Sequence, residues 1–278
     1  AQGMQVHFFL RGERYWNNVL DETESIIIEN RLKNEGVQIH YHTELSEILT
    51  QSNRVIGVKT KDGRHIRCEL CAYAIGVLPR IELAQAAGLK IDRGILTDQF
   101  MTTSDPDIFA AGDVAQIFDP FSGKSVLDTL WSPARNSGAN AGLNMTGMQV
   151  PFQKYIAYNV TRLAGLTTTI IGSVGRGIDP SLVGIARGDS ETWRMLPNAV
   201  IAEKSHAVNR LRLVVGEKHL LGAIVMGEQA LSIPLQELVA QQVDITSVRE
   251  NLLQTHQLGD VTLSFWEHWR SQRAHQKS

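Results

Sequence analysis

An aspartate directly after a glycine, Gly112-Asp113, is the first pair in this sequence whose types and spacing suit ligand chemistry. The apolar run before it, residues 108–111, predicts a short buried strand. Asp113 would then stand at the carboxyl end of a strand, where open α/β sheets place their ligands. For the pair taken alone, a turn aspartate or a helix cap is the more common interpretation.

A helix rich in small side chains is predicted from residue 132 onward, and its start suits an anion. Ser132 is expected to cap this helix, and Pro133 is expected to occupy its first position. The amides of Ala134 and Arg135 would then point outward at the positive end of the helix dipole, which attracts negative charge. An ordinarily capped helix without a ligand is the alternative interpretation.

Two cysteines, Cys68 and Cys71, form a C-x-x-C pair that invites a redox interpretation. The pattern of the surrounding residues, 65–76, predicts a strand, and residues three apart in a strand point to opposite faces. We therefore expect structural cysteines whose sulfur atoms do not meet. No cysteine and histidine cluster has metal-ligand spacing, so no metal site is predicted.

Three ordered motifs resemble the FAD-dependent pyridine nucleotide-disulfide oxidoreductases, on the rubredoxin reductase and nitrite reductase side of that family. The motifs are AIGVLPR at residues 74–80, TTSDPDIFAAGD at 102–113 and LWSPARNSGANAGLNMTG at 130–147. The resemblance runs from residue 1 to about residue 255 and implies FAD and NAD(P)H as cofactors.

The resemblance also implies roles for single residues. Asp113 would accept a hydrogen bond from a ribityl hydroxyl of FAD, and an ionised acceptor makes a stronger bond than a neutral one. The helix start would face the pyrimidine edge of the flavin, where negative charge gathers on reduction. Gly76 would let the backbone cross back to the FAD domain, although a plain turn at the end of a strand is an equally good explanation of this sequence. The cofactor-binding residues so implied are Gly76, Gly112, Asp113, Val114, Trp131, Ser132, Pro133 and Ala134, and no catalytic residue is identified.

The chain also departs from the family pattern. The two phosphate-binding G-x-G-x-x-G loops are not in this sequence, and the glycines of 172–177 are expected to form a loop between strands. Leu10 stands where an acid would hold the ribose hydroxyls of NAD, and Arg11 and Arg14 follow it. Arg11 is a candidate for binding a 2′-phosphate, with an exposed surface arginine as the alternative. The C-terminal His-Pro pair of the disulfide reductases is missing as well, so disulfide chemistry is not expected.

The elements that position these residues predict an α/β fold. The first part of the chain is predicted to contain a strand (6–10), a helix with acids in its first turn (21–36), a hairpin around Asp62-Gly63 and a short helix (81–88). Strands followed by helices (234–242 and 247–254) dominate after about residue 165. The expected fold is part of a flavoprotein with Rossmann-like FAD and NAD(P) domains and a C-terminal α+β interface domain. The expected domains are the C-terminal part of the NAD(P)-binding domain (1–93), the second segment of the FAD-binding domain (94–149), the interface domain (150–255) and a tail (256–278). The chain is expected to begin within a domain, because its first residues lead at once into a strand.

The last third of the sequence contains the features that indicate possible binding partners. Its hairpin, within 209–229, is expected to have an apolar face that the chain's helices cover in part. The family resemblance implies that a second subunit covers the rest, which gives a homodimer. In the tail, Trp266 and Trp269 share one helix face. We expect them to pack on the chain's own C-terminal domain, with docking to a partner or a membrane surface as the alternative.

Composition limits the classes of function. The 27 basic and 29 acidic residues, without a basic run before the tail, argue against nucleic acid. The apolar stretches fall short of the roughly 18 residues that a membrane span needs. Two cysteines fit a reducing compartment, so a cytoplasmic protein is expected.

The expected function is that of an FAD-dependent NAD(P)H oxidoreductase. Hydride would pass from nicotinamide to flavin, and electrons would pass on to an acceptor protein or small molecule without a redox disulfide. The activity is expected in a longer chain or complex, because this stretch alone lacks the glycine loops. The alternative is a non-catalytic assembly subunit or remnant that keeps the flavoprotein fold.

Overall fold

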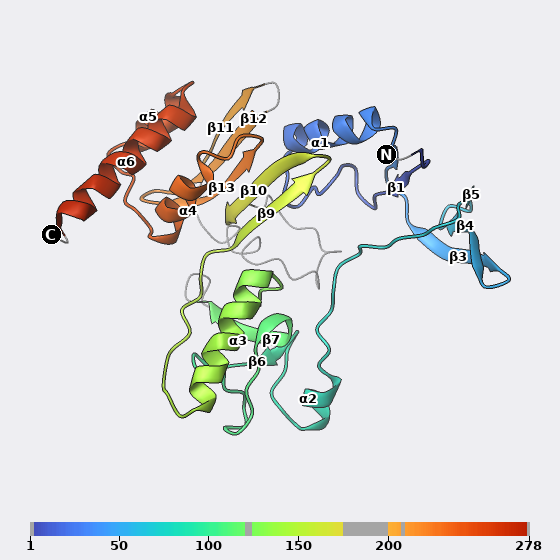
Figure 1. Ribbon diagram of the computed structural model, residues 1–278, viewed down its shortest axis with the longest axis horizontal. Coiled ribbons are helices and arrows are strands. Elements are labelled where there is room, and N and C mark those ends of the chain that lie inside the picture. Colours follow the sequence, from blue (N-terminus) through green and yellow to red (C-terminus); the bar gives the residue numbers. More distant parts are fainter. Residues whose placement is uncertain (1–2, 120–123, 175–199, 207–208, 277–278) are drawn as a thin grey trace. The chain divides into compact units, whose positions relative to one another are not determined.

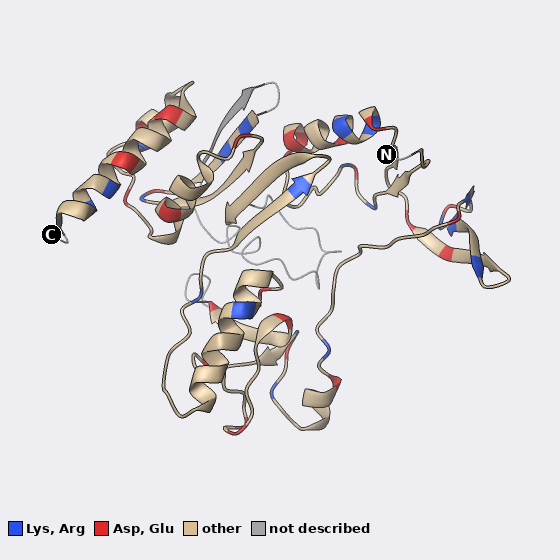
Figure 2. Cartoon of the chain, viewed as in Figure 1, with Lys and Arg blue, Asp and Glu red and all other residues tan. Residues whose placement is uncertain are grey.

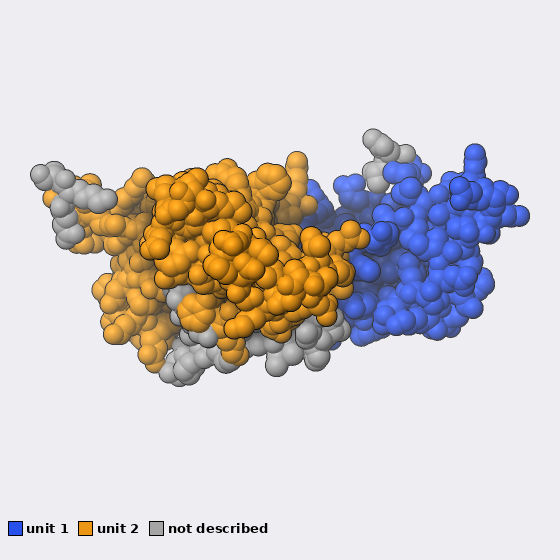
Figure 3. Space-filling model, turned by 90° about the horizontal axis from the view of Figure 1, so that it is seen from below, with its two compact units in different colours: residues 1–75, 163–165 blue, residues 76–162, 166–278 orange. Residues whose placement is uncertain are grey.

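The computed structural model describes all residues except 1–2, 120–123, 175–199, 207–208 and 277–278. Two compact units are coloured separately in Figure 3. Unit 1 comprises residues 1–75 with 163–165, and unit 2 comprises residues 76–162 with 166–278. The first division therefore falls at residue 75, while the four predicted domain ranges remain predictions.

Unit 1 begins with the predicted strand and helix. Two parallel strands pair Phe9 with His40 in Cα register. The helix that connects them starts at a capping box, in which the Asp21 carboxylate accepts from the Glu24 N–H at 2.8 Å and the Asp21 N–H donates to the Glu24 carboxylate at 2.8 Å. The elements are β1 (His7–Phe9), α1 (Glu22–Asn34) and β2 (Gln38–His40), labelled in Figure 1.

A three-stranded antiparallel sheet follows in unit 1. In its first turn Ser52 and Asn53 have φ values of 49° and 62°, the left-handed conformation that two-residue hairpin loops require. In its second turn Gly63 has a φ of 89°, which confirms the hairpin predicted around Asp62-Gly63. The strands are β3 (Leu45–Gln51), β4 (Arg54–Thr60) and β5 (His65–Arg67).

Unit 2 begins with a short helix and a small mixed sheet. The helix ends before Gly88, whose φ of 74° suits the residue after a helix. In the sheet, β6 is parallel to β7, and β7 is antiparallel to β8. Buried side chains of Met101, Ala110, Ala115, Ile117 and Ala141 form its core. The elements are α2 (Glu82–Ala86), β6 (Ile95–Leu96), the 3-10 helix η1 (Gly112–Val114), β7 (Ala115–Asp119), β8 (Lys124–Leu127) and α3 (Trp131–Met145).

A five-stranded sheet forms the strand-rich region that the sequence predicts after residue 165. Its order is β11-β12-β13-β10-β9, and the predicted hairpin is the antiparallel pair β12 and β13. The glycine run 172–177 reaches into 175–199, so the loop predicted there lies largely outside the described residues. The strands are β9 (Tyr158–Leu163), β10 (Leu166–Gly172), β11 (Val200–His206), β12 (Asn209–Val215) and β13 (Leu220–Met226).

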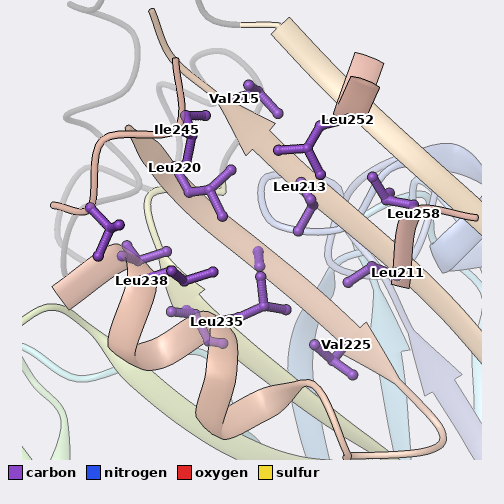
Figure 4. Packing of buried hydrophobic residues seen from close by; sticks show 14 residues of the cluster. Leu211, Leu213, Val215, Leu220, Val225, Leu235, Leu238, Ile245, Leu252 and Leu258 are labelled. Atoms are coloured by element: carbon purple, nitrogen blue, oxygen red, sulfur yellow. The ribbon is translucent and has the colours of Figure 1, made fainter. Parts of the chain in front are cut away.

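Three helices pack on this sheet and close a hydrophobic core, shown in Figure 4. Trp266 and Trp269 pack against this core, which confirms the predicted contact with the chain's own domain. The apolar side of the hairpin is therefore buried within one chain. The expected tail is itself one of the helices that cover this face, and the homodimer stays a prediction. The helices are α4 (Ser232–Ala240), α5 (Arg249–Gln254) and α6 (Leu258–Gln276).

Candidate functional site

The candidate site is built around the turn of Gly112 and Asp113. Ala111 is extended, and Gly112 has a left-handed φ of 74°. The Gly112 N–H donates to the Ser137 hydroxyl at 3.0 Å, and this hydroxyl donates to the Ala134 carbonyl at 3.1 Å. A Cβ on Gly112 would lie 3.7 Å from Ala134 Cβ, an ordinary contact, so the backbone conformation rather than lack of space favours glycine. These bonds fasten the turn to α3.

The strand predicted before Asp113 was wrong. Residues 108–111 contribute only an isolated bridge between Thr102 and Phe109. A tight turn, closed by the Ile108 N–H and the Asp105 carbonyl, immediately precedes this bridge, so too few residues remain for a ladder of paired strands. A short apolar run fits a packed loop as well as it fits a strand. Asp113 therefore lies directly before β7 rather than after a strand, and its side chain is exposed.

The start of α3 also differs from the prediction. Its N-cap is Leu130, and no side chain caps the helix. The Ala134 N–H donates to the Leu130 carbonyl at 3.1 Å and closes the first turn. Ser132 and Pro133 are therefore the second and third helical residues, and the predicted Ser132 cap and first-position Pro133 were wrong. The N–H groups of Trp131 and Ser132 have no intrahelical acceptor, so the end keeps its attraction for an anion.

The predicted site residues differ in exposure. Trp131 is 84% exposed at the start of α3, and Val114 is half-buried. Gly76 has a φ of 100° and is exposed, in the irregular segment that precedes α2. Arg11 belongs to unit 1 and is exposed there. The structure thus gathers the residues of η1 and the first turn of α3, while Gly76 and Arg11 lie on other segments.

Sequence reasoning missed the asparagines that hold α3. Asn144 Nδ2 donates to the Phe100 carbonyl at 2.9 Å, and Asn144 Oδ1 accepts from the Val150 N–H at 2.8 Å. Asn140 Nδ2 donates to the Val150 carbonyl at 3.0 Å. Two asparagines four residues apart on one helix face were the available signal. They fix α3 against the loop before it and the chain after it.

A buried ion pair lies in the same part of unit 2. Lys154 Nζ is 3.6 Å from Asp119 Oδ2, and the two side chains are 6% and 0% exposed. The two residues are far apart in the sequence, so no local pattern predicts their contact. Lys154 and Pro133, in the first turn of α3, both line a small hollow, whose other lining residues are Ile117, Val126, Asp128, Phe152 and Tyr155.

The strand predicted through the two cysteines was wrong beyond β5. Residues 68–80 form no strand, because no strand among the described residues pairs with them. Cys68 and Cys71 are half-buried and free, so they make no disulfide. Burial, and then the charge of Cys71, raises the pKa of the Cys68 thiol. The argument from opposite strand faces no longer applies, but a raised pKa disfavours the nucleophilic thiolate.

The described part of the chain offers neither a metal site nor a membrane-spanning helix. Its histidines, cysteines and carboxylates form no group of three that could hold a metal ion. None of its helices combines the length and apolar character needed to cross a bilayer.

Comparisons with known proteins found related sequences. The sequence model of the pyridine nucleotide-disulphide oxidoreductases matches residues 1–138. An NAD(P)H sulfur oxidoreductase (CoA-dependent) of Pyrococcus abyssi is 34% identical over 181 residues, which cover 61% of this chain and 39% of that protein. An NADH oxidase of Methanocaldococcus jannaschii is 26% identical over 234 residues, which cover 82% of this chain and 48% of that protein. The chain therefore spans less than half the length of these relatives.

Solved structures show the same fold. A ferredoxin reductase from Rhodopseudomonas palustris superposes with a TM-score of 0.75 at 22% identity, covering 94% of this chain and 59% of that one. The predicted fold class, part of a flavoprotein with FAD and NAD(P) domains, is confirmed by this likeness. The match over residues 1–138 confirms the expected resemblance to the pyridine nucleotide-disulphide oxidoreductases, and the solved structure shares the fold of this chain.

Proposed function

We propose that this chain is part of an FAD-dependent NAD(P)H oxidoreductase. Hydride passes from nicotinamide to flavin, and electrons pass on to an acceptor without a redox disulfide. The observation that carries the proposal is the Gly112-Asp113 turn, which the Ser137 hydroxyl fastens to the first turns of α3. An exposed carboxylate and the open end of a helix are thereby held on neighbouring segments.

The residues of this site fit FAD. Asp113 supplies an exposed carboxylate that accepts a hydrogen bond from a ribityl hydroxyl. The free N–H groups of Trp131 and Ser132 supply positive potential toward the pyrimidine edge of the flavin. FAD, when bound, supplies an acceptor for hydride and a donor of electrons. The chain's own part is to bind and orient that group.

The acceptor is proposed only as a class. The relatives and neighbours carry names with different acceptors, among them a sulfur oxidoreductase, an NADH oxidase and a ferredoxin reductase. A protein or a small molecule therefore fits. A dithiol route through this chain's own cysteines is disfavoured, because burial raises the pKa of the Cys68 thiol and so disfavours its thiolate.

We also propose the homodimer that the family resemblance implies, and a cytoplasmic location. The free Cys68 and Cys71 support a reducing compartment. A dimer contact in the C-terminal region has to use a surface other than the side of the sheet that α4, α5 and α6 cover. Sedimentation of the flavoprotein at micromolar concentration tests the dimer, and a monomer would refute it.

Anaerobic mixing of the FAD-loaded protein with NADPH or NADH tests the central proposal. The flavin absorbance is expected to bleach, and an artificial dye acceptor is expected to restore it. A Cys68→Ser, Cys71→Ser variant should bleach and recover like the parent protein. Bleaching that fails with both nucleotides contradicts the oxidoreductase proposal, and a large loss in the serine variant contradicts the absence of a dithiol step.

A further inference from the structure

The five-stranded sheet ends on one side at β9, which pairs with β10 and with no other strand of the described chain. A two-residue loop, Ala164 and Gly165, joins β9 to β10, and its φ values of 46° and 76° are both left-handed. This is the conformation of the tight hairpin turn in which the residues that flank the loop form a hydrogen-bonded pair. The outer edge of β9 is therefore an edge of the whole sheet.

The hydrogen-bonding direction of each residue in β9 follows from this turn. Successive residues of a strand alternate, so every second residue counted back from the loop turns its N–H and C=O groups toward β10. The bond from the Gly172 N–H to the Ala157 carbonyl, at 2.7 Å, has the same parity and the same register as the loop. The N–H and C=O groups of Tyr158 and Val160 therefore point to the outer edge, and no bulge interrupts the strand between.

This edge lacks the features that usually protect the edges of sheets. Such features are proline, several charged side chains, bulges and very short strands. β9 has six residues, no proline and a single charged residue, Arg162, and Figure 2 shows how little charge it carries. Val160, in the middle of the strand, is 51% exposed. At the opposite side of the sheet, helices α5 and α6 contact β11. β9 is thus the edge that suits strand addition.

We propose that β9 pairs with β9 of a second copy, antiparallel and around a two-fold axis at Asn159. This inference rests on the proposed function, because it gives the proposed homodimer its contact surface. In this register Tyr158 lies opposite Val160 of the partner subunit, and Val160 lies opposite Tyr158 of the partner subunit. Each pair exchanges two main-chain hydrogen bonds, since both residues direct their N–H and C=O groups outward. The two five-stranded sheets then continue into one.

The side chains of β9 complement themselves in this register. Tyr158 packs against the hydrophobic core of its own subunit, so its ring is already held. Its pairing with the exposed Val160 of the partner subunit is an aromatic and β-branched pair, a favourable combination across strands. On the other face Asn159 meets its own symmetry mate, and an amide can both donate and accept. An isologous contact requires such self-complementarity, which favours a second copy as the occupant.

Cysteine cross-linking of the full-length flavoprotein tests the register. In a Cys68→Ser, Cys71→Ser background, Asn159→Cys is expected to form a disulfide between subunits on mild oxidation. The two residues at the axis would have Cα atoms about 4.5 Å apart, within reach of a disulfide. Thr161→Cys is the matched control, because it lies on the same face but would be roughly 13 Å from its mate. It should stay uncross-linked on a non-reducing gel.

Sedimentation at a series of micromolar concentrations tests the edge without a covalent bond. Val160→Lys places a charge on the outer edge and removes both pairs with Tyr158, so it should raise the Kd of the dimer by about tenfold or more. Ile233→Lys is the control, because Ile233 is an apolar residue of α4 that is 61% exposed and lies away from β9. This change should leave the Kd unchanged.

The outcomes separate this inference from the oxidoreductase proposal. A parent protein that stays monomeric overturns the edge pairing, as it would if another segment of a longer polypeptide covered β9. Cross-linking of Thr161→Cys as fast as Asn159→Cys also overturns it, as does an equal loss of dimer in Val160→Lys and Ile233→Lys. The cysteine variants decide the matter even if Val160→Lys folds poorly. Flavin reduction by NADPH or NADH reports on the oxidoreductase proposal in every case.

Discussion

Two regions of this chain that contain predicted site residues are built in different ways. In unit 2, the turn of Gly112 is tied to α3 by a side chain, Ser137, and α3 is tied to the following segment by its asparagines. In unit 1, backbone bonds hold the loop after β1, where Arg11 is exposed. The first region is therefore held through side chains, and the second is held through its backbone.

An ion pair that is buried in unit 2 and one that is exposed in unit 1 are expected to differ in their contribution to stability. Lys154→Met should lower the free energy of unfolding of unit 2 by about 3 to 5 kcal/mol, because it leaves the buried Asp119 carboxylate without its ammonium partner. Urea denaturation followed by tryptophan fluorescence measures this loss. The control is Lys61→Met in unit 1, where the pair with Glu44 is exposed and worth about 0 to 1 kcal/mol. Equal losses in the two variants would remove the contrast between the units.

Gly112 tests whether the turn depends on its backbone conformation. Gly112→Ala should cost about 1 to 2 kcal/mol, because alanine is strained at a φ of 74°. Gly138→Ala is the matched control, since Gly138 lies within α3 and a Cβ there would meet nothing within 4 Å. This second change should stabilise the protein by about 0.5 to 1 kcal/mol. Thermal unfolding of both variants checks the opposite signs, and a neutral Gly112→Ala would show that the turn tolerates a side chain.

A smaller effect of pH is expected in unit 1. Burial, and then the charges of His7 and Arg64, lowers the pKa of His40 below its ordinary 6.5. Because the folded pKa is the lower one, this contribution to stability is fully present above about pH 6.5 and is lost as the pH falls through the folded pKa. Urea denaturation at pH 7.5 and at lower pH measures the change. His40→Gln should flatten this dependence, and a variant that keeps the same dependence would exclude His40 as its source.

The sequence predicted the local features well. The helix predicted over 21–36 and the Asp62-Gly63 turn depend on residues a few positions apart, so the residue types carry the signal, although the Asp21 capping box was not predicted. The strand predicted over residues 108–111 was wrong, because an apolar tetrapeptide fits a strand and a packed loop equally well.

Contacts between residues far apart in the chain could not be predicted from the sequence. Ser137 reaches Gly112 from another element, and Lys154 meets Asp119 only once the chain has folded. The predicted start of α3 was wrong because the first turn closes on the Leu130 carbonyl. Every residue type has a backbone carbonyl, so the sequence does not show which one accepts this bond. The motifs nevertheless named two segments, the Gly112 turn and α3, that the structure brings into contact.

The FAD affinity of an Asp113→Ala variant tests the central claim most directly. The apparent Kd, measured by flavin fluorescence on the full-length protein, should rise by about tenfold to a hundredfold, as expected for the loss of a charge-assisted hydrogen bond. Asp107→Ala removes an exposed carboxylate from the loop before the turn and should leave the Kd unchanged. An unchanged flavin affinity in Asp113→Ala would contradict the account and make Asp113 an ordinary turn residue.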